Sequence, residues 1–164
     1  MNIKSGYGKI LTGISKLFGV DTAKKFDTRL RFQRDLNLNQ PKSLADKVTY
    51  LELHDPSPLA PKCTDKYAVW QYVEEKGYED ILVPVVGGPC SKIEEVDFTT
   101  LPESFVFKAP HGCKMNYLVP EKGKMDKKKC VNEMSKWLKT TYGTYSMEPH
   151  YLKIPHRIYA EEYL

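Results

Sequence analysis

Apolar residues recur at helical spacing in three separate stretches of the first 54 positions. Because residues three and four positions apart share one face of an α-helix, each stretch predicts an amphipathic helix. Asp21 can cap the second helix, the segment Asn37–Pro41 ends it, and Ser43 stands at a capping-box distance from Asp46 in the third. The apolar positions are Ile10, Leu11, Ile14, Leu17, Phe18, Ala23, Phe26, Leu30, Leu44, Val48 and Leu51.

The pattern becomes mixed after a proline-rich loop at residues 55–61. A helix is predicted to begin near Thr64, which can act as its N-cap, and to end at Gly77. The short apolar run Ile81–Val83 predicts a buried strand. Residues 85–90, which contain two glycines and a proline, predict a turn.

Two short β-prone runs, Phe105–Phe107 and Tyr117–Val119, flank a polar loop that contains Gly112. This arrangement predicts a hairpin with a long turn, in which Lys108 closes the first strand. A lysine at a strand end beside a glycine-containing loop can place a positive charge and backbone N–H groups around one phosphate. The same pattern also fits a solvated lysine, so the rest of the chain has to decide between the two interpretations.

The last part of the chain predicts one more helix and one more strand. Asp126 can cap the helix, and a glycine and two prolines exclude a long helix in residues 142–155. Residues 157–164 alternate enough to form a strand, and its abrupt apolar end predicts either a strand at a sheet edge or a chain that is a fragment of a longer protein. The apolar face of the helix is formed by Cys130, Met134, Trp137 and Leu138.

With 164 residues, 41% of them hydrophobic, the chain can form one sizeable core, and an α+β domain with an N-terminal extension is predicted. No apolar run approaches the roughly 18 residues of a membrane span, and no signal-peptide pattern opens the chain, which favours a cytoplasmic protein. The cysteines lack the spacing of a disulfide framework or a zinc site. We therefore expect buried thiols and no metal site from Cys63, Cys90, Cys113 and Cys130.

The net charge of +4 is unevenly distributed. Residues 1–34 contain eight Lys/Arg and two Asp, which leaves a net charge of −2 on the rest of the chain. The body is therefore not expected to bind nucleic acid. The basic, amphipathic N-terminal segment could contact the inner face of an anionic membrane or a partner, or could dock on the domain itself.

Four motifs occur in a fixed order: Asn39–Leu51, Thr64–Val73, Leu101–Lys108 and Ile158–Leu164. Together they resemble the TupA-like ATP-grasp family, from about Arg29 to the last residue. That family is named for a teichuronopeptide biosynthesis protein. It is also called a glycosyltransferase family, because its members occur among capsular and exopolysaccharide biosynthesis proteins.

The resemblance implies that ATP lies between a small lobe and a larger, magnesium-binding lobe. Lys66 and Lys108 would neutralise phosphate oxygens, and the loop 111–116 would close over the distal phosphates through its backbone N–H groups. The main chain of Glu162 and Leu164 would hydrogen-bond adenine, and Glu161 would accept from its amino group. The implied cofactor-binding residues are Lys66, Lys108, His111, Gly112, Lys114, Glu161, Glu162 and Leu164.

Two features depart from the pattern of ATP-grasp enzymes. The loop contains one glycine where many ATP-grasp loops have several, and the magnesium ligands of the family would follow Leu164. We therefore expect a helical extension at residues 1–60 and a small lobe at residues 61–164. Without the catalytic lobe, the chain is expected to be inactive by itself.

Several single residues keep a simpler interpretation. Asp65 could only stabilise a helix N-terminus, His111 could only fill the turn, and Glu161 could be an edge-strand charge. Trp70 and Trp137 are expected in the core.

Three functions are compatible with the sequence. The first is an ATP-dependent carboxylate–amine ligase that acts on a uronic-acid-containing polymer of the cell surface. The second is a glycosyltransferase, although no DxD-like metal motif is present. The third is a catalytically inactive module that binds a partner or membrane. The expected partners are a nucleotide and a polysaccharide or sugar precursor.

Overall fold

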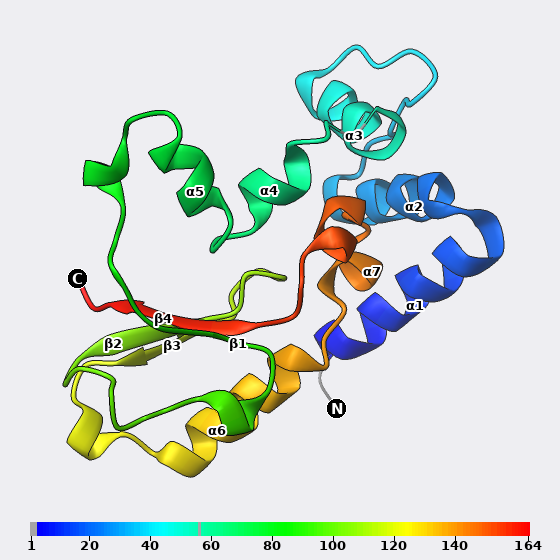
Figure 1. Ribbon diagram of the computed structural model, residues 1–164. Helices are drawn as coiled ribbons and strands as arrows, with labels where there is room; N and C mark the ends of the chain where they lie inside the picture. The colour runs from blue at the N-terminus through cyan, green and yellow to red at the C-terminus, as the bar shows by residue number, and fades with distance from the viewer. Residues whose placement is uncertain (1–2, 56) are drawn as a thin grey trace. The chain divides into compact units, whose positions relative to one another are not determined.

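The computed structural model describes residues 3–55 and 57–164, which form two compact units (Figure 1). The first unit combines the chain up to Ala60 with Thr141–Lys153, and the second combines Pro61–Thr140 with Ile154–Leu164. The described residues contain seven α-helices and one four-stranded antiparallel sheet, which confirms the predicted α+β class. The assignment of residues 1–60 and 61–164 to an extension and a small lobe stays a prediction.

The first unit is helical. Leu11, Ala23 and Met147 form its buried cluster, against which Tyr7, Ile14 and Val20 pack. The three predicted N-terminal helices are present, and the fold adds two short helical segments from residues 141–153. These elements are α1 (Ile3–Phe18), α2 (Val20–Phe32), α3 (Leu44–His54), α7 (Tyr142–Ser146) and the 3₁₀-helix η4 (Pro149–Lys153).

Two N-caps were predicted in this unit, and one of them is confirmed. The Ser43 hydroxyl accepts a hydrogen bond from the backbone N–H of Asp46 at 3.1 Å, which confirms the predicted start of α3. The prediction that Asp21 caps α2 is wrong, because α2 begins at Val20 after Gly19. Gly19 has φ +85°, a conformation that glycine adopts without steric cost, and it lets the chain turn between α1 and α2.

The second unit is built around the sheet. Short helices precede the first strand, and one long helix precedes the last. Its elements are α4 (Ala60–Thr64), within which the unit begins, α5 (Val69–Glu74), η1 (Glu79–Ile81), β1 (Val85–Cys90), η2 (Ile93–Glu95), β2 (Phe105–Lys108), β3 (Asn116–Val119), η3 (Lys122–Lys124), α6 (Lys127–Leu138) and β4 (Ile158–Glu162).

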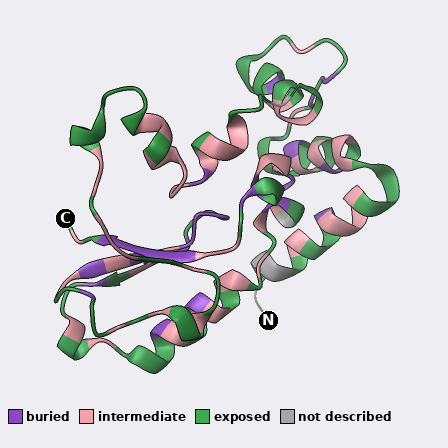
Figure 2. Cartoon of the chain, viewed as in Figure 1, coloured by how far each residue is buried: buried purple, intermediate pink, exposed green. Residues whose placement is uncertain are grey.

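The last strand lies inside the sheet, whose order is β1-β4-β2-β3. The expectation of an edge strand at residues 157–164 is therefore wrong, and four of the five residues of β4 are buried (Figure 2). The predicted hairpin of β2 and β3 is confirmed. In the register between β2 and β4, Val106 pairs with Glu161 and Lys108 pairs with Tyr159. Since paired residues share a face, Lys108, Tyr159 and Glu161 lie on one face of the sheet.

The opposite face of the sheet carries the core. Phe105 and Phe107 are buried, with ring centroids 5.0 Å apart, and α6 runs along this side, whereas α4 and α5 lie on the other (Figure 1). Asp126 caps α6 as predicted, accepting from the backbone N–H of Lys129 at 2.9 Å. Cys130 and Met134 of α6 have no exposed surface.

The cysteines and tryptophans differ from expectation. Cys130 is buried, and burial raises the pKa of its thiol to about 12. Cys63 and Cys113 are exposed and Cys90 is partly exposed, so the expectation of buried thiols is wrong for these three. Trp70 and Trp137 are half-buried instead of fully in the core.

Three predictions between residues 64 and 90 are wrong. The helix predicted from Thr64 to Gly77 is shorter than expected: Thr64 is the last residue of α4, and α5 begins only at Val69, after a turn in which the Asp65 side chain accepts from the backbone N–H groups of Tyr67 and Ala68. The strand predicted at Ile81–Val83 is absent, and the predicted turn at residues 85–90 is strand β1.

Close packing against β4 explains the composition of β1. Gly88 has φ +86°, and a Cβ at this position would lie 2.8 Å from the carbonyl oxygen of Ile158. A larger residue would push β1 away from β4, so the glycines that locally suggest a turn are needed for strand pairing.

Candidate functional site

An ion pair lies on the face of the sheet opposite α6. Lys108 of β2 donates to the carboxylate of Glu161 on β4. The Tyr159 hydroxyl lies 2.8 Å from the other oxygen of this carboxylate. Glu161 is 5% exposed, so these contacts compensate a charge that burial would otherwise destabilise. Burial raises the pKa of Tyr159, and the hydrogen bond to Glu161 raises it further, so the hydroxyl stays protonated.

A second lysine, Lys66, reaches the loop between β2 and β3. Its ammonium group donates to the carbonyl oxygen of Gly112 at 2.6 Å. Its own carbonyl oxygen lies 3.2 Å from the Tyr159 hydroxyl, which ties the segment after α4 to the sheet. Lys66 and Lys108, the two lysines implied by the family resemblance, thus bind groups that lie near each other on the face of the sheet opposite α6.

Lys66 has a different electrostatic environment from Lys108. Among the described residues, no carboxylate lies within ion-pair distance of its ammonium group. Burial lowers its pKa, as does the charge of Lys108, whereas the charges of Cys113, Asp65 and Glu161 act in the opposite direction. A bound anion would supply the charge partner that the ammonium lacks.

A second buried ion pair supports this segment. Arg157 donates to Asp65 at 2.5 Å, and its guanidinium lies 4.7 Å from the ring centroid of Tyr67. Asp65 therefore does more than favour a helix N-terminus, since it joins the segment after α4 to the start of β4. No local pattern predicts this pair, because the partners are 92 positions apart.

The loop is supported from the end of α6 by two stacked histidines. His111 Nε2 lies 2.8 Å from the carbonyl oxygen of Trp137, and His156 Nδ1 lies 2.8 Å from that of Leu138. The imidazole centroids are 4.2 Å apart, with planes inclined by 13°. Because a carbonyl can only accept, both nitrogens carry protons and donate to the last carbonyls of the helix, which lack partners within it.

His111 is buried, and its Nδ1 has no hydrogen-bond partner among the described residues. Burial is also the main reason that the pKa of His111 is lowered, so the side chain is neutral near pH 7. These contacts give His111 a supporting role beneath the loop. Its predicted contact with a phosphate stays a prediction.

The remaining predicted residues surround this cluster less closely. Gly112 is buried and offers its carbonyl to Lys66, whereas Lys114 is exposed in a left-handed conformation with φ 60°. The backbone N–H of Glu162 donates to the carbonyl of Pro84 at 2.9 Å, so an adenine contact from this residue would use its carbonyl. Leu164 is 89% exposed beyond the end of β4. The predicted adenine contacts of these last residues stay predictions.

The charges on this face favour an anionic ligand. Three cations, Lys66, Lys108 and Arg157, face two carboxylates, Asp65 and Glu161, which leaves one positive charge in excess. Two ammonium groups beside a buried loop fit the oxygens of a phosphate chain. We call these five residues with Gly112 the charged face.

A comparison with protein families gives the class of this chain. The family described as TupA-like ATPgrasp matches residues 46–164, which include both lysines, the loop and β4. The chain therefore belongs to the TupA-like ATP-grasp family, as the order of its four motifs predicted. Proteins with the ATP-grasp fold generally bind ATP together with magnesium. No curated protein and no solved structure matches the chain.

The hydropathy of the helices also bears on the class of protein. Within residues 3–55 and 57–164, none of the helices has the length and apolar character that crossing a membrane requires.

Proposed function

We propose that the charged face binds the phosphates of ATP, and that the chain supplies this nucleotide-contacting part to an enzyme of cell-surface polysaccharide biosynthesis. The reaction would join a carboxylate of a uronic-acid-containing polymer to an amine at the expense of ATP. The observation that carries the proposal is that Lys66, Lys108 and Glu161, three residues implied by the family, converge on one face of the sheet beside the Gly112 loop.

Each residue has a role that follows from its contacts. Lys66 would exchange its bond to the Gly112 carbonyl for a phosphate oxygen, which would give an anionic partner to an ammonium whose pKa burial lowers. Lys108 would contact a second phosphate oxygen while Glu161 holds its side chain in place. Tyr159 and Arg157 would position the strand and the segment after α4. Magnesium bound together with ATP would supply further positive charge to the phosphates.

The chemistry would begin with transfer of the terminal phosphoryl group to the carboxylate, which gives an acyl phosphate. The amine would then attack the acyl carbon, and phosphate would leave as the amide bond forms. The lysines would favour these two reaction steps because they neutralise the negative charge that builds up on the phosphates of the leaving nucleotide.

Titration calorimetry of the 164-residue chain with magnesium-ATP tests the binding role. Lys66→Ala and Lys108→Ala should each weaken ATP binding by about 10- to 100-fold, the loss expected for one charge-assisted hydrogen bond. Lys108→Ala should have the larger effect, because it leaves the Glu161 carboxylate to repel phosphate.

The matched control is Lys128→Ala, which removes an exposed lysine from α6 in the same unit. It should leave ATP affinity unchanged, and thermal unfolding should show that all three variants are folded. If both Lys66→Ala and Lys108→Ala bind ATP like the unmodified chain, the proposed site is wrong.

A glycosyltransferase is the second candidate function, because the family is also known by that name. The two candidates differ in the donor that is consumed. Incubation of the enzyme that contains this chain with ATP, an amino acid and a uronic-acid polymer should release ADP and phosphate, whereas incubation with nucleotide sugars should leave the donor intact. Consumption of a nucleotide sugar without loss of ATP would favour the glycosyltransferase.

We also propose that residues 1–34 attach the protein to the inner face of an anionic membrane. The support is that the net charge of this segment is +6 and that large apolar side chains of α1 and α2 remain exposed, including Leu17 at 77% and Phe18 at 68%. Basic and apolar side chains together are typical of helices that lie in a membrane interface.

A further inference from the structure

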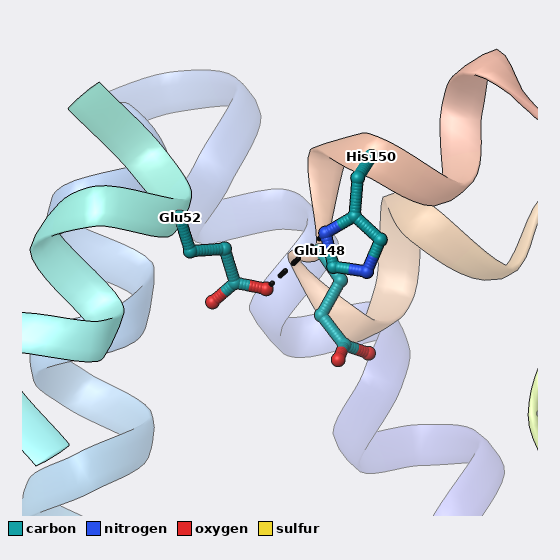
Figure 3. A group of neighbouring side chains, drawn as sticks. All are labelled: Glu52, Glu148 and His150. Atoms are coloured by element: carbon teal, nitrogen blue, oxygen red, sulfur yellow. Dashed lines mark ion pairs between the residues drawn. The ribbon is translucent and has the colours of Figure 1, made fainter. Parts of the chain in front are cut away.

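Three potential metal ligands meet in the first unit, far from one another in the sequence. Glu52 comes from α3 and His150 from η4, whereas Glu148 directly precedes η4 (Figure 3). One donor atom from each lies within 4.8 Å of the other two. The carboxylate of Glu52 lies 3.7 Å from Nδ1 of His150, and both side chains are 17% exposed. The three groups are thus half-buried and point toward one another.

The cluster borders a pocket of about 690 Å³. Val48 and Leu51 line it with apolar surface, and Asp55 adds another carboxylate. A cation held by the cluster would therefore keep an open coordination position toward a space large enough for a small ligand.

We propose that Glu52, Glu148 and His150 form a binding site for a divalent transition metal ion, with Zn²⁺ as the ion that this ligand set fits best. Imidazole nitrogen and carboxylate oxygen are both zinc ligands, and the two carboxylates balance the charge of the ion. Zn²⁺ bonds of about 2.0–2.2 Å require donor atoms about 3.3–3.6 Å apart in a tetrahedral site. Side-chain rotation within the half-buried cluster would bring the donors to that spacing.

Lys24 competes with the metal for the same carboxylate. Its ammonium lies 3.3 Å from Oε2 of Glu52. When a divalent ion neutralises both carboxylates, this ammonium becomes an unfavourable neighbour. Removing the charge should therefore strengthen metal binding, whereas an ion-pair network without a metal would only be weakened by the same change.

Titration calorimetry of the 164-residue chain with ZnCl₂ tests the site. The unmodified chain should bind one Zn²⁺ at the cluster, and His150→Ala and Glu148→Gln should each weaken that binding at least about tenfold. Lys24→Met should bind Zn²⁺ more tightly than the unmodified chain. MgCl₂ should produce no comparable binding, because Mg²⁺ prefers octahedral oxygen coordination.

Exposed thiols are the main competing ligands for Zn²⁺, so the titration is repeated with Co²⁺ as a coloured substitute. An imidazole and carboxylate site gives visible bands without the intense near-ultraviolet absorption that thiolate ligands produce. The matched control is His54→Ala, which removes an exposed histidine of the same helix and should leave the affinity unchanged.

Three results would overturn the proposal: no Zn²⁺ binding by the unmodified chain, thiolate absorption with Co²⁺, or unchanged affinity in Glu148→Gln. Glu148→Gln preserves the size of the side chain, so it remains informative if His150→Ala fails to fold.

Discussion

At the scale of single residues, buried ionisable groups give the charged face its properties. Glu161 is held by Lys108 and Tyr159, and Asp65 is held by Arg157. Each carboxylate has a cationic partner, so removing one member of a pair leaves a buried charge that costs several kcal/mol. Lys66 is the exception because its ammonium donates to the neutral carbonyl of Gly112, and we expect it to respond most strongly to an incoming anion.

His111 makes the stability of the fold depend on acid. Its pKa in the folded chain is lowered by burial, whereas in the unfolded chain it returns to about 6.5. The two states are equally unprotonated above that value, and as the pH falls below it the unfolded state takes up a proton that the folded state resists. The free energy of unfolding should therefore decrease as the pH is lowered from about 7.5 to about 5. His111 contributes a slope of up to about 1.4 kcal/mol per pH unit to this decrease.

Urea unfolding at several pH values checks this prediction. His111→Gln should show a smaller acid-dependent loss than the unmodified chain, whereas His54→Gln, which changes an exposed histidine, should retain most of it. Equal acid dependence in His111→Gln and the unmodified chain would assign the effect to other groups.

At the scale of elements, α1 and α2 form one helical pair with two distinct surfaces. Leu11 and Ala23 face the buried cluster of the first unit, which fits the alternative that the amphipathic segment docks on its own domain. The last turn of α1 nevertheless exposes Lys16, Leu17 and Phe18 together. The two interpretations of residues 1–34 therefore apply to different faces of the same pair.

The exposed turn gives the membrane proposal a specific test. In sedimentation with lipid vesicles, the protein should bind phosphatidylcholine vesicles that contain phosphatidylserine and should bind pure phosphatidylcholine poorly. The double variant Leu17→Ser/Phe18→Ser should lose most of the binding, because it removes the apolar side chains that would enter the interface.

The control is Leu118→Ser, which replaces a leucine of β3 that is 59% exposed in the other unit. It should bind vesicles like the unmodified protein. If the double variant and the control are recovered with vesicles equally, the turn does not anchor the protein.

Elements also show which sequence signals are reliable. Ser43 and Asp126 mark helix starts correctly because capping depends on adjacent residues. Residues 85–90 were wrongly predicted as a turn because their role depends on pairing with β4, about seventy positions later. Long-range contacts of this kind leave no periodic pattern in a single sequence.

At the scale of the whole molecule, each unit is assembled from two separate segments of the chain. Met147 is 4% exposed and packs with Leu11 and Ala23, so residues 141–153 belong structurally with the N-terminal helices. A chain of residues 61–164 would keep this segment without the helices that cover it. It should therefore bind the hydrophobic dye ANS and unfold less cooperatively than the full chain.

A second truncation serves as the control. In it, residues 141–153 are also replaced by a short Gly/Ser linker, which can span the gap because the Leu138 carbonyl lies 2.8 Å from His156. This variant should bind less ANS than residues 61–164 alone. If residues 61–164 unfold as cooperatively as the full chain and bind no more dye, the segment does not need the N-terminal helices.

In the candidate site, as in the fold, the features that depend on local sequence were predictable and those that depend on long-range contacts were not. The resemblance located Lys66, Lys108 and Glu161 because each belongs to a local motif with a family precedent. Arg157 and the Glu52, Glu148 and His150 cluster could not be found in this way, because their partners lie almost a hundred positions away. Glu52 meets Glu148 and His150 only because the chain folds, so no local spacing in the sequence indicates the cluster.

The central position of β4 also determines when the sheet can be completed during synthesis. The β2–β3 hairpin can form as soon as residue 119 has left the ribosome, but β1 pairs only with β4. Because synthesis proceeds at about 5–20 residues per second, β1 remains unpaired for roughly several seconds until β4 has been made. During that interval the exposed strand is open to chaperones and to other nascent chains, and the charged face exists only after residue 161 has been translated.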